Sequence, residues 1–208
     1  MLDIYMCKID IESKEKVALI KKLRELVSID RKQKIDDYIL DDDKLRSAMA
    51  EIMIKKVLMD KYGFRKSNIA FKYSKYGKPY LVGCDRIYFN VSHSGKWIVC
   101  AFADKEVGID IQNTDKEVSN SVIDKVCSSN EKELIKTADS GAFYKFWTLK
   151  EAYTKALGKG LLMKFSDLDF SNTIKKITLN IENVGVSNCS FYSMKVDKHY
   201  MMSICVMK

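Results

Sequence analysis

Two groups of side chains in this sequence have types and spacings that could carry chemistry. In the first, Asp110 alternates with isoleucines in the segment VGIDIQ, so Asp110 and Gln112 share one face of an expected strand. A carboxylate and an amide two positions apart can both offer oxygen ligands to a hard divalent cation. A strand that emerges into solvent shows the same alternation, so this group alone does not establish a metal site.

The second group stands in the segment FYKFWTLKEAYTKALGKGL, where Trp147, Glu151 and Lys155 follow one another at intervals of four. This spacing places them on one face of a helix and makes Glu151 and Lys155 neighbours. Such a pair is often no more than an exposed ion pair. Here Phe143 and Phe146 indicate that much of the helix is buried, which favours a position at the edge of a cleft.

Together and in this order, the two groups resemble the 4′-phosphopantetheinyl transferases of the surfactin-synthetase-activating type. That family has a G-x-D-x-E strand followed by W-x-x-K-E-x-x-x-K on a helix. The matching positions here are Gly108, Asp110 and Gln112, then Trp147, Lys150, Glu151 and Lys155. Three further matches are the S-H-S-G of Ser92 to Gly95, the Y-G-K-P of Tyr76 to Pro79, and the G-K-G of Gly158 to Gly160. The resemblance extends upstream through Arg31, Lys34 and Arg46, and so covers most of the chain.

The resemblance implies an enzyme that transfers the 4′-phosphopantetheine arm of coenzyme A to a serine of an acyl or peptidyl carrier protein. The reaction would depend on Mg²⁺ and release 3′,5′-adenosine bisphosphate. Asp110, Gln112 and Glu151 would hold the metal, and Glu151 and Lys155 would be the catalytic residues. Gln112 departs from the family's acid at its position: it offers a carbonyl oxygen but no charge, so metal binding should depend more on the two carboxylates.

The resemblance also implies a set of residues that bind coenzyme A. Arg31, Lys34, Arg46 and His93 match positions around its 3′-phosphate and neighbouring phosphates, and Lys78 and Pro79 would lie beside the adenine. The cofactor-binding set is completed by Ser92, Lys150 and Lys155. Each of these has a plain alternative, because charged residues also stand on solvated helix faces and a loop histidine can simply be a hydrogen-bonding group.

The helices and strands that position these residues are predicted from the spacing of apolar residues and from the glycine and proline residues that interrupt it. Apolar spacing predicts a strand at 2–9, helices at 13–27, 31–39 and about 44–62, short strands between 64 and 112 with YGKPY as a turn, and helices at 119–137 and 141–157. In the tail, KKITLNI, CSFYSMKV and YMMSICVM predict a three-stranded meander.

Helices followed by strands occur twice in this order, which predicts the α+β class with two similar halves, an α/β pseudo-dimer. Each half would pack helices on a small, mainly antiparallel sheet, with the cofactor in the groove between them. Residues 1–107 would form the N-terminal, coenzyme A-binding half, and residues 108–208 the half with the metal and catalytic residues. An undivided α+β domain remains the alternative, because no residue-level repeat is visible.

The composition is that of a globular protein, and its positive charge would suit an anionic partner or simply reflect lysines on solvated faces. The chain has 208 residues, 47% of them hydrophobic, and a formal charge of +8. Six scattered cysteines without C-x-x-C spacing, an N-terminus without a signal pattern and the lack of a membrane-spanning run predict a reduced, cytoplasmic protein. The expected partners are coenzyme A and a carrier protein, with no nucleic acid and no membrane, for a monomer with an internal pseudo-twofold.

The residues leave three alternatives. Aromatic residues interleaved with lysines at 71–80 would suit a module that binds single-stranded nucleic acid, but such a module does not explain Asp110 and Glu151. A coenzyme A binder without transferase activity is motivated by Gln112 alone. A serine hydrolase is disfavoured because Ser92 and His93 are adjacent on a strand and point to opposite faces. Neither of the usual phosphate loops, G-x-x-x-x-G-K-[ST] and G-x-G-x-x-G, is present.

Overall fold

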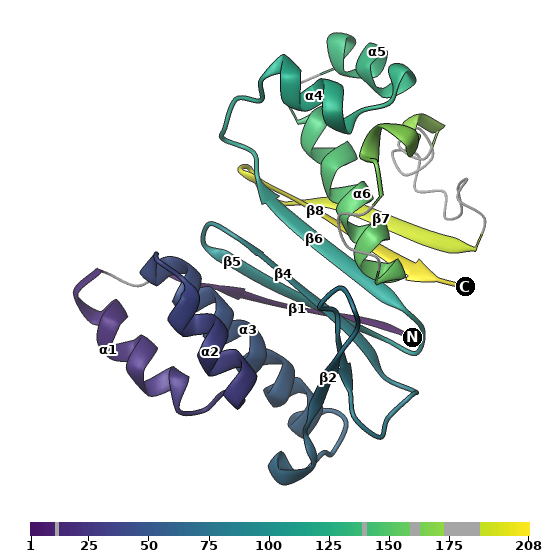
Figure 1. Cartoon of the computed structure of the whole chain (residues 1–208). Coiled ribbons are helices and arrows are strands. Elements are labelled where there is room, and N and C mark those ends of the chain that lie inside the picture. The colour runs from purple at the N-terminus through teal and green to yellow at the C-terminus, as the bar shows by residue number, and fades with distance from the viewer. Residues whose placement is uncertain (11–12, 139–140, 159–162, 173–187) are drawn as a thin grey trace.

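Two three-stranded antiparallel sheets stack face to face at the centre of the molecule, and helices cover both outer faces (Figure 1). This computed structural model describes residues 1–10, 13–138, 141–158, 163–172 and 188–208. The first sheet has the order β1-β5-β4, formed by Leu2–Lys8, Trp97–Ala103 and Tyr88–Ser94. The second has the order β6-β8-β7, formed by Val107–Asn113, Tyr200–Met207 and Cys189–Asp197.

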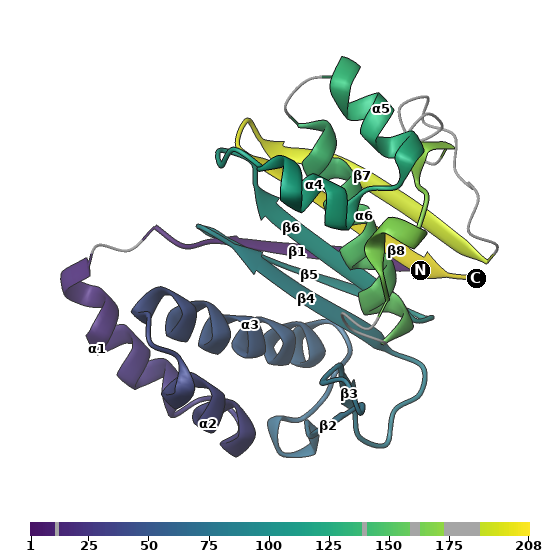
Figure 2. The same cartoon turned by 45° about the horizontal axis from the view of Figure 1, so that its top comes forward.

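Three helices cover the outer face of the first sheet (Figure 2). They are α1 (Ser13–Arg24), α2 (Ile29–Asp37) and α3 (Asp41–Asp60). The last packs Ile54 and Leu58 against Phe89 and Phe102 of the sheet. A short 3-10 helix (Lys66–Asn68) then leads to a small hairpin, β2 (Phe71–Tyr73) and β3 (Pro79–Leu81), whose turn holds the YGKP residues.

Three helices belong to the outer side of the second sheet: α4 (Asn120–Val126), α5 (Ser129–Thr137) and α6 (Ala142–Leu157). A 3-10 helix (Phe165–Asp167) follows. The first two stand where the sequence predicted one helical segment, because Ser128 begins α5 with a capping box completed by Glu131. Helix α6 lies on β6 and β8, where Phe146, Leu149 and Ala152 are buried.

The sheets meet through apolar side chains and through hydrogen bonds from one sheet's edge. Val99 and Ala101 of the first sheet face Ile109, Ile111 and Met202 of the second. Backbone N–H groups of β6 donate to side chains of β4, from Ile109 to Asn90 (3.0 Å), from Ile111 to Ser92 (3.4 Å) and from Asn113 to Ser94 (3.0 Å). We call these three bonds the seam.

The fold confirms the predicted class: mixed helices and antiparallel sheets in two similar halves. In the tail, CSFYSMKV and YMMSICVM form the hairpin β7–β8, and β8 also pairs with β6, which the predicted meander did not include. The third strand of that meander stays a prediction. The segment KKITLNI lies outside the described residues. The boundary at residue 107 stays a prediction. Across the described part of the chain, no helix combines the length and apolar character needed to cross a membrane.

Candidate active site

A close approach of β6 to α6 brings the two sequence groups together. Gly108 makes this contact possible, because an added Cβ there would lie 2.0 Å from the carbonyl oxygen of Ala152 and 2.4 Å from the amide nitrogen of Ala156. Atoms cannot approach so closely, so any other residue would push the helix away from the strand. The glycine of G-x-D therefore sets the distance between the strand that carries Asp110 and the helix that carries Lys155.

Asp110 and Lys155 form an ion pair at the edge of β6. The Lys155 ammonium lies 2.6 Å from Oδ1 of Asp110 and also donates to Ser92 Oγ (3.0 Å) and to the Ile109 carbonyl (3.2 Å). Ser92 Oγ donates in turn to the same Asp110 oxygen at 2.8 Å. Asp110 is 2% exposed, whereas the side chain of Lys155 is 26% exposed. The ammonium thus neutralises a buried carboxylate while remaining accessible to a ligand.

Glu151 is a second carboxylate of this site, and it lies one helical turn before Lys155. Among the described residues, no hydrogen bond or ion pair reaches its carboxylate, while its backbone carbonyl accepts from Thr154 Oγ1 at 3.0 Å. Burial raises the pKa of Glu151; the charge of Lys155 opposes this rise and that of Asp110 adds to it. A partly buried carboxylate of this kind is suited to accept a proton or to bind a cation.

Gln112 lies beside Asp110, as the strand alternation predicted. Its Nε2 donates a hydrogen bond to Oδ2 of Asp110 at 3.1 Å. The carbonyl oxygen of the Gln112 amide is then still available as a metal ligand. Asp110, Gln112 and Glu151 together offer two carboxylates and an amide, all hard oxygen ligands, and the Glu151 carboxylate has no partner within the part of the chain that the structure describes. This donor set fits Mg²⁺. Within the described residues, no group of three His, Cys, Asp or Glu side chains could hold a metal, in agreement with the amide at position 112.

A cleft of about 250 Å³ opens beside the ion pair and gathers most of the residues predicted to bind coenzyme A. Its lining contains Arg31, Lys34, Lys78, Pro79 and Lys155. These residues come from α2, the β2–β3 turn and α6, so segments far apart in the chain meet there. Four of the predicted cationic residues, Arg31, Lys34, Lys78 and Lys155, thus lie around one cavity.

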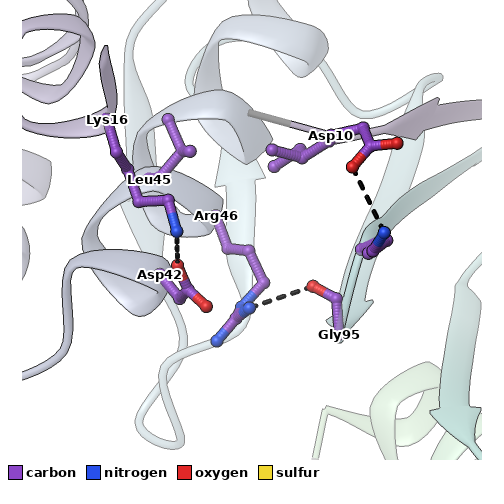
Figure 3. Close-up of a pocket in the computed structure, with 8 residues that line it drawn as sticks. Asp10, Lys16, Asp42, Leu45, Arg46 and Gly95 are labelled. Carbon is purple, nitrogen blue, oxygen red and sulfur yellow. Dashed lines mark hydrogen bonds and ion pairs between the residues drawn. The ribbon is translucent and has the colours of Figure 1, made fainter. Parts of the chain in front are cut away.

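Arg46 lines a neighbouring cavity of about 210 Å³ (Figure 3). Its guanidinium donates to the Gly95 carbonyl at 2.9 Å and to Asp43 at 2.7 Å. The charges of Arg46 and Lys155 both act on His93. Burial, together with these two charges, lowers the pKa of His93 to about 4. The imidazole is therefore neutral at pH 7 and can donate only from one ring nitrogen.

The structure places Lys150 away from this site, contrary to its prediction as a cofactor-binding residue. Its side chain is 0% exposed and donates to Glu131 (2.6 Å) and to the carbonyl groups of Val126 (2.7 Å) and Phe165 (2.8 Å). With its donors used inside the protein, Lys150 joins α6 to α4, α5 and the 3-10 helix. Glu151 is its neighbour in sequence but lies about 100° further round the helix.

The lining of the cleft includes residues that the sequence did not single out. Tyr73 stacks with Lys34, whose ammonium is 4.7 Å from the ring centroid. Asn90 also lines the cleft, and it holds the Ile109 amide in the seam. The polar alternation of Asn90, Ser92 and Ser94 in an otherwise apolar strand was a signal that could have identified the seam. Tyr73 belongs to the run of aromatic residues and lysines at 71–80, which the sequence linked only to the nucleic-acid alternative.

Comparison with known proteins gives two family matches that follow one another along the chain. Residues 106–205 match the model of the 4′-phosphopantetheinyl transferase superfamily. Residues 15–105 match the model described as 4′-phosphopantetheinyl transferase, N-terminal. The two matches together cover residues 15–205, which include all the site residues discussed above; β1 lies before the first match.

Individual relatives agree with these matches. The chain is 27% identical to 4′-phosphopantetheinyl transferase Sfp of Bacillus subtilis over 190 residues, which are 89% of this chain and 84% of the relative. It is 35% identical to 4′-phosphopantetheinyl transferase gsp of Aneurinibacillus migulanus over 139 residues, 65% of this chain and 57% of that protein. An L-aminoadipate-semialdehyde dehydrogenase-phosphopantetheinyl transferase of Xenopus laevis is 27% identical over 175 residues, 76% of this chain and 57% of the relative.

Proposed function

The chain belongs to the 4′-phosphopantetheinyl transferase superfamily, and on that basis we propose that it transfers the phosphopantetheine arm of coenzyme A to a serine of an acyl or peptidyl carrier protein. The reaction is Mg²⁺-dependent and releases 3′,5′-adenosine bisphosphate. One observation carries this proposal: Lys155 lines the cationic cleft and is also bonded to Asp110. A phosphate-binding region and a carboxylate site therefore share a side chain.

Asp110, Glu151 and the carbonyl oxygen of Gln112 are the groups that would hold the magnesium ion. When bound, the ion orients the pyrophosphate of coenzyme A and spreads the charge that develops on it. Gln112 brings no charge, so the two carboxylates provide all of the negative charge in the set. In the metal-free protein, Lys155 offsets the charge of Asp110.

The chain's own residues then have distinct tasks. Glu151 accepts the proton of the carrier serine, directly or through a water molecule, as its attack on the β-phosphate begins. General-base assistance of this kind typically contributes about 10²–10⁴-fold in rate. Lys155 lies against the same phosphates and stabilises the charge on the departing 3′,5′-adenosine bisphosphate.

The cleft residues bind the adenosine end of coenzyme A. Arg31 and Lys34 supply positive charge from α2, and Pro79 supplies an apolar edge for the adenine. Arg46 approaches the 3′-phosphate from the cavity that it lines, and His93 contributes its neutral imidazole as a donor. Ser92 Oγ completes the set beside Lys155.

The division of labour between the halves follows from this arrangement. Residues 1–107 contribute most of the coenzyme A contacts, and residues 108–208 carry the metal ligands and the base. We propose that the protein is a monomer, because the single chain already supplies both halves of the site. We also propose that it acts in the cytoplasm. The net charge of +8 would attract acidic carrier proteins.

The nucleic-acid alternative is not favoured. The aromatic and lysine residues at 71–80 form the β2–β3 hairpin, where Tyr73 and Tyr76 line the same small cleft as Lys155 and the Lys78 side chain is 5% exposed. A buried lysine cannot track a nucleic-acid backbone. The other alternative, a coenzyme A binder without transferase activity, is distinguished from a transferase by whether modified carrier protein is formed.

The test is the intact mass of an apo carrier protein after incubation with this protein, coenzyme A and Mg²⁺. We expect the carrier to gain the mass of one phosphopantetheine arm, and the gain to disappear with a chelator. Glu151→Ala should abolish the gain, while Glu133→Ala, which alters a carboxylate 71% exposed on α5, should not. No gain with fatty-acid, polyketide and peptide carriers would leave coenzyme A binding without transfer.

A further inference from the structure

Lys78 lines the coenzyme A cleft, but its ammonium is held by acceptors of the protein itself. Its ammonium donates to Glu106 Oε2 at 2.5 Å, to the Val107 carbonyl at 3.1 Å and to the Ala156 carbonyl at 2.9 Å. The side chain is 5% exposed. A lysine ammonium has three hydrogens to donate, and these three acceptors account for all of them.

Two of these acceptors belong to elements of the catalytic half. Val107 begins β6, three residues before Asp110, and Ala156 stands next to Lys155 near the end of α6. The carbonyl groups of the last helical turn have no partner within the helix, and a cation near that end also interacts favourably with the helix dipole. Lys78 thus supplies a C-terminal cap for α6 from a distant part of the chain.

The backbone of the same residue belongs to the turn that lines the cleft. The Lys78 amide donates to Ser74 Oγ at 3.1 Å, and its carbonyl accepts from the Ser74 amide at 2.8 Å. Tyr76, Gly77 and Pro79 of this turn line the cleft. The side chain is also packed against the helix end, because an added Cβ at Gly158 would lie 3.4 Å from Lys78 Cδ.

We propose that Lys78 is a positioning residue that couples occupancy of the coenzyme A cleft to the end of α6, and that its ammonium is not a ligand of the phosphates. This inference rests on the proposed function. Coenzyme A bound in the cleft contacts the turn and so fixes the position of Lys78. The Lys78 ammonium in turn fixes the Ala156 carbonyl, next to Lys155. A displacement of reacting groups by about 1 Å can cost about 10²-fold in rate.

The test compares Lys78→Met with wild type and with Lys72→Met, a change of an exposed lysine on β2. Methionine keeps a stem of similar shape and removes the donor. Coenzyme A affinity is measured by calorimetry at two salt concentrations, turnover by the carrier mass assay, and protection of α6 amides by hydrogen exchange with and without coenzyme A.

We expect Lys78→Met to bind coenzyme A within about threefold of wild type, with an unchanged salt dependence, because no cation–phosphate contact is lost. Turnover should fall tenfold or more at saturating coenzyme A. In wild type, coenzyme A should slow exchange at the amides of the last turn of α6, and Lys78→Met should lose this slowing although coenzyme A is bound. Lys72→Met should match wild type in all three measurements.

Two results would overturn the proposal. One is a tenfold or greater loss of affinity with a weaker salt dependence, the signature of a direct phosphate contact. The other is ligand-dependent protection of α6 that persists in Lys78→Met. A wild-type protein that binds no coenzyme A would instead overturn the proposed function and the coupling with it. The Glu106→Gln variant is a control for misfolding, because it removes only the charge of one acceptor of Lys78. It should also keep its affinity for coenzyme A while losing turnover, by a smaller factor than Lys78→Met.

Discussion

The Lys155 ammonium and Oδ1 of Asp110 lie 2.6 Å apart, and the carboxylate of this pair is almost completely buried. A buried carboxylate that loses its only ammonium partner carries an uncompensated charge. We therefore expect Lys155→Met to lower the free energy of unfolding by about 2 kcal/mol in chelator, since the lysine is itself partly exposed. Mg²⁺ should stabilise this variant more than wild type, because the cation would replace the lost charge. Urea unfolding with and without Mg²⁺ measures both effects.

The control is Lys164→Met, which breaks an ion pair whose side chains are 74% and 66% exposed and should change stability by less than about 0.5 kcal/mol. Equal Mg²⁺ stabilisation of Lys155→Met and wild type would contradict a metal site at Asp110.

The amide of Gln112 gives a second prediction. Gln112→Glu places a new carboxylate where Nε2 now donates to Asp110 Oδ2. We expect it to lower the Mg²⁺ concentration needed for half-maximal transfer, since the charge of the ligand set increases. Without metal, the like charges should make it less stable than wild type at pH 7. Activity titrated with Mg²⁺ tests the first effect; a large loss of activity at saturating Mg²⁺ would show that the neutral side chain is itself required.

Gly108 gives a third prediction. Because an added Cβ would overlap the backbone of α6, Gly108→Ala should cost about 3 kcal/mol or more in stability and remove most of the transfer activity. The matched control is Gly63→Ala, where φ is +71° and nothing lies within 4 Å of the added atom. That substitution should cost about 1 kcal/mol through backbone strain alone and leave activity unchanged. Thermal unfolding of both variants measures the difference, and equal losses would argue against a close strand–helix contact.

His93 gives a prediction about pH. Burial and two cations lower its pKa from 6.5 to about 4 in the folded protein. Between pH 6.5 and 4 the unfolded chain therefore binds more protons at this residue, and the folded state loses stability as the pH falls. His93→Gln should remove this contribution, which reaches about 3 kcal/mol for a shift of this size. Urea unfolding of both proteins from pH 7 to pH 4 is the measurement, and curves that stay parallel would refute the shift.

Much of the fold followed from periodicity. The long helix α3 has bounds that agree with the predicted range of about 44–62 to within a few residues, and β4, β5 and β6 lie in the region from 64 to 112 that was predicted to hold short strands. One helix was predicted at 119–137, because the helical spacing is continuous there. The structure has two helices in this segment, since Ser128 and Glu131 begin a new helix within it. The small β2–β3 hairpin was predicted only as a turn, since strands of three residues show too little alternation.

The site was predictable where chemistry depends on local spacing. Asp110 with Gln112, and Glu151 with Lys155, are neighbours for reasons that a strand or a helix alone dictates. Lys150 and Lys78 could not be placed in this way, because a long side chain can leave its own element. The acceptors that hold them, at Phe165 and Ala156, become neighbours only in the tertiary structure.

The seam also bears on whether the second half of the chain can exist without the first. The amides of Ile109, Ile111 and Asn113 lie on the free edge of their sheet, and each one bonds a residue nineteen positions earlier in the sequence. An uncovered strand edge is a template for pairing with other molecules. A protein cut after residue 105 and expressed as two fragments would expose this edge in the second fragment. Aggregation of that fragment alone, and its rescue by co-expression of the first, would follow from a protective role of the first half toward the second.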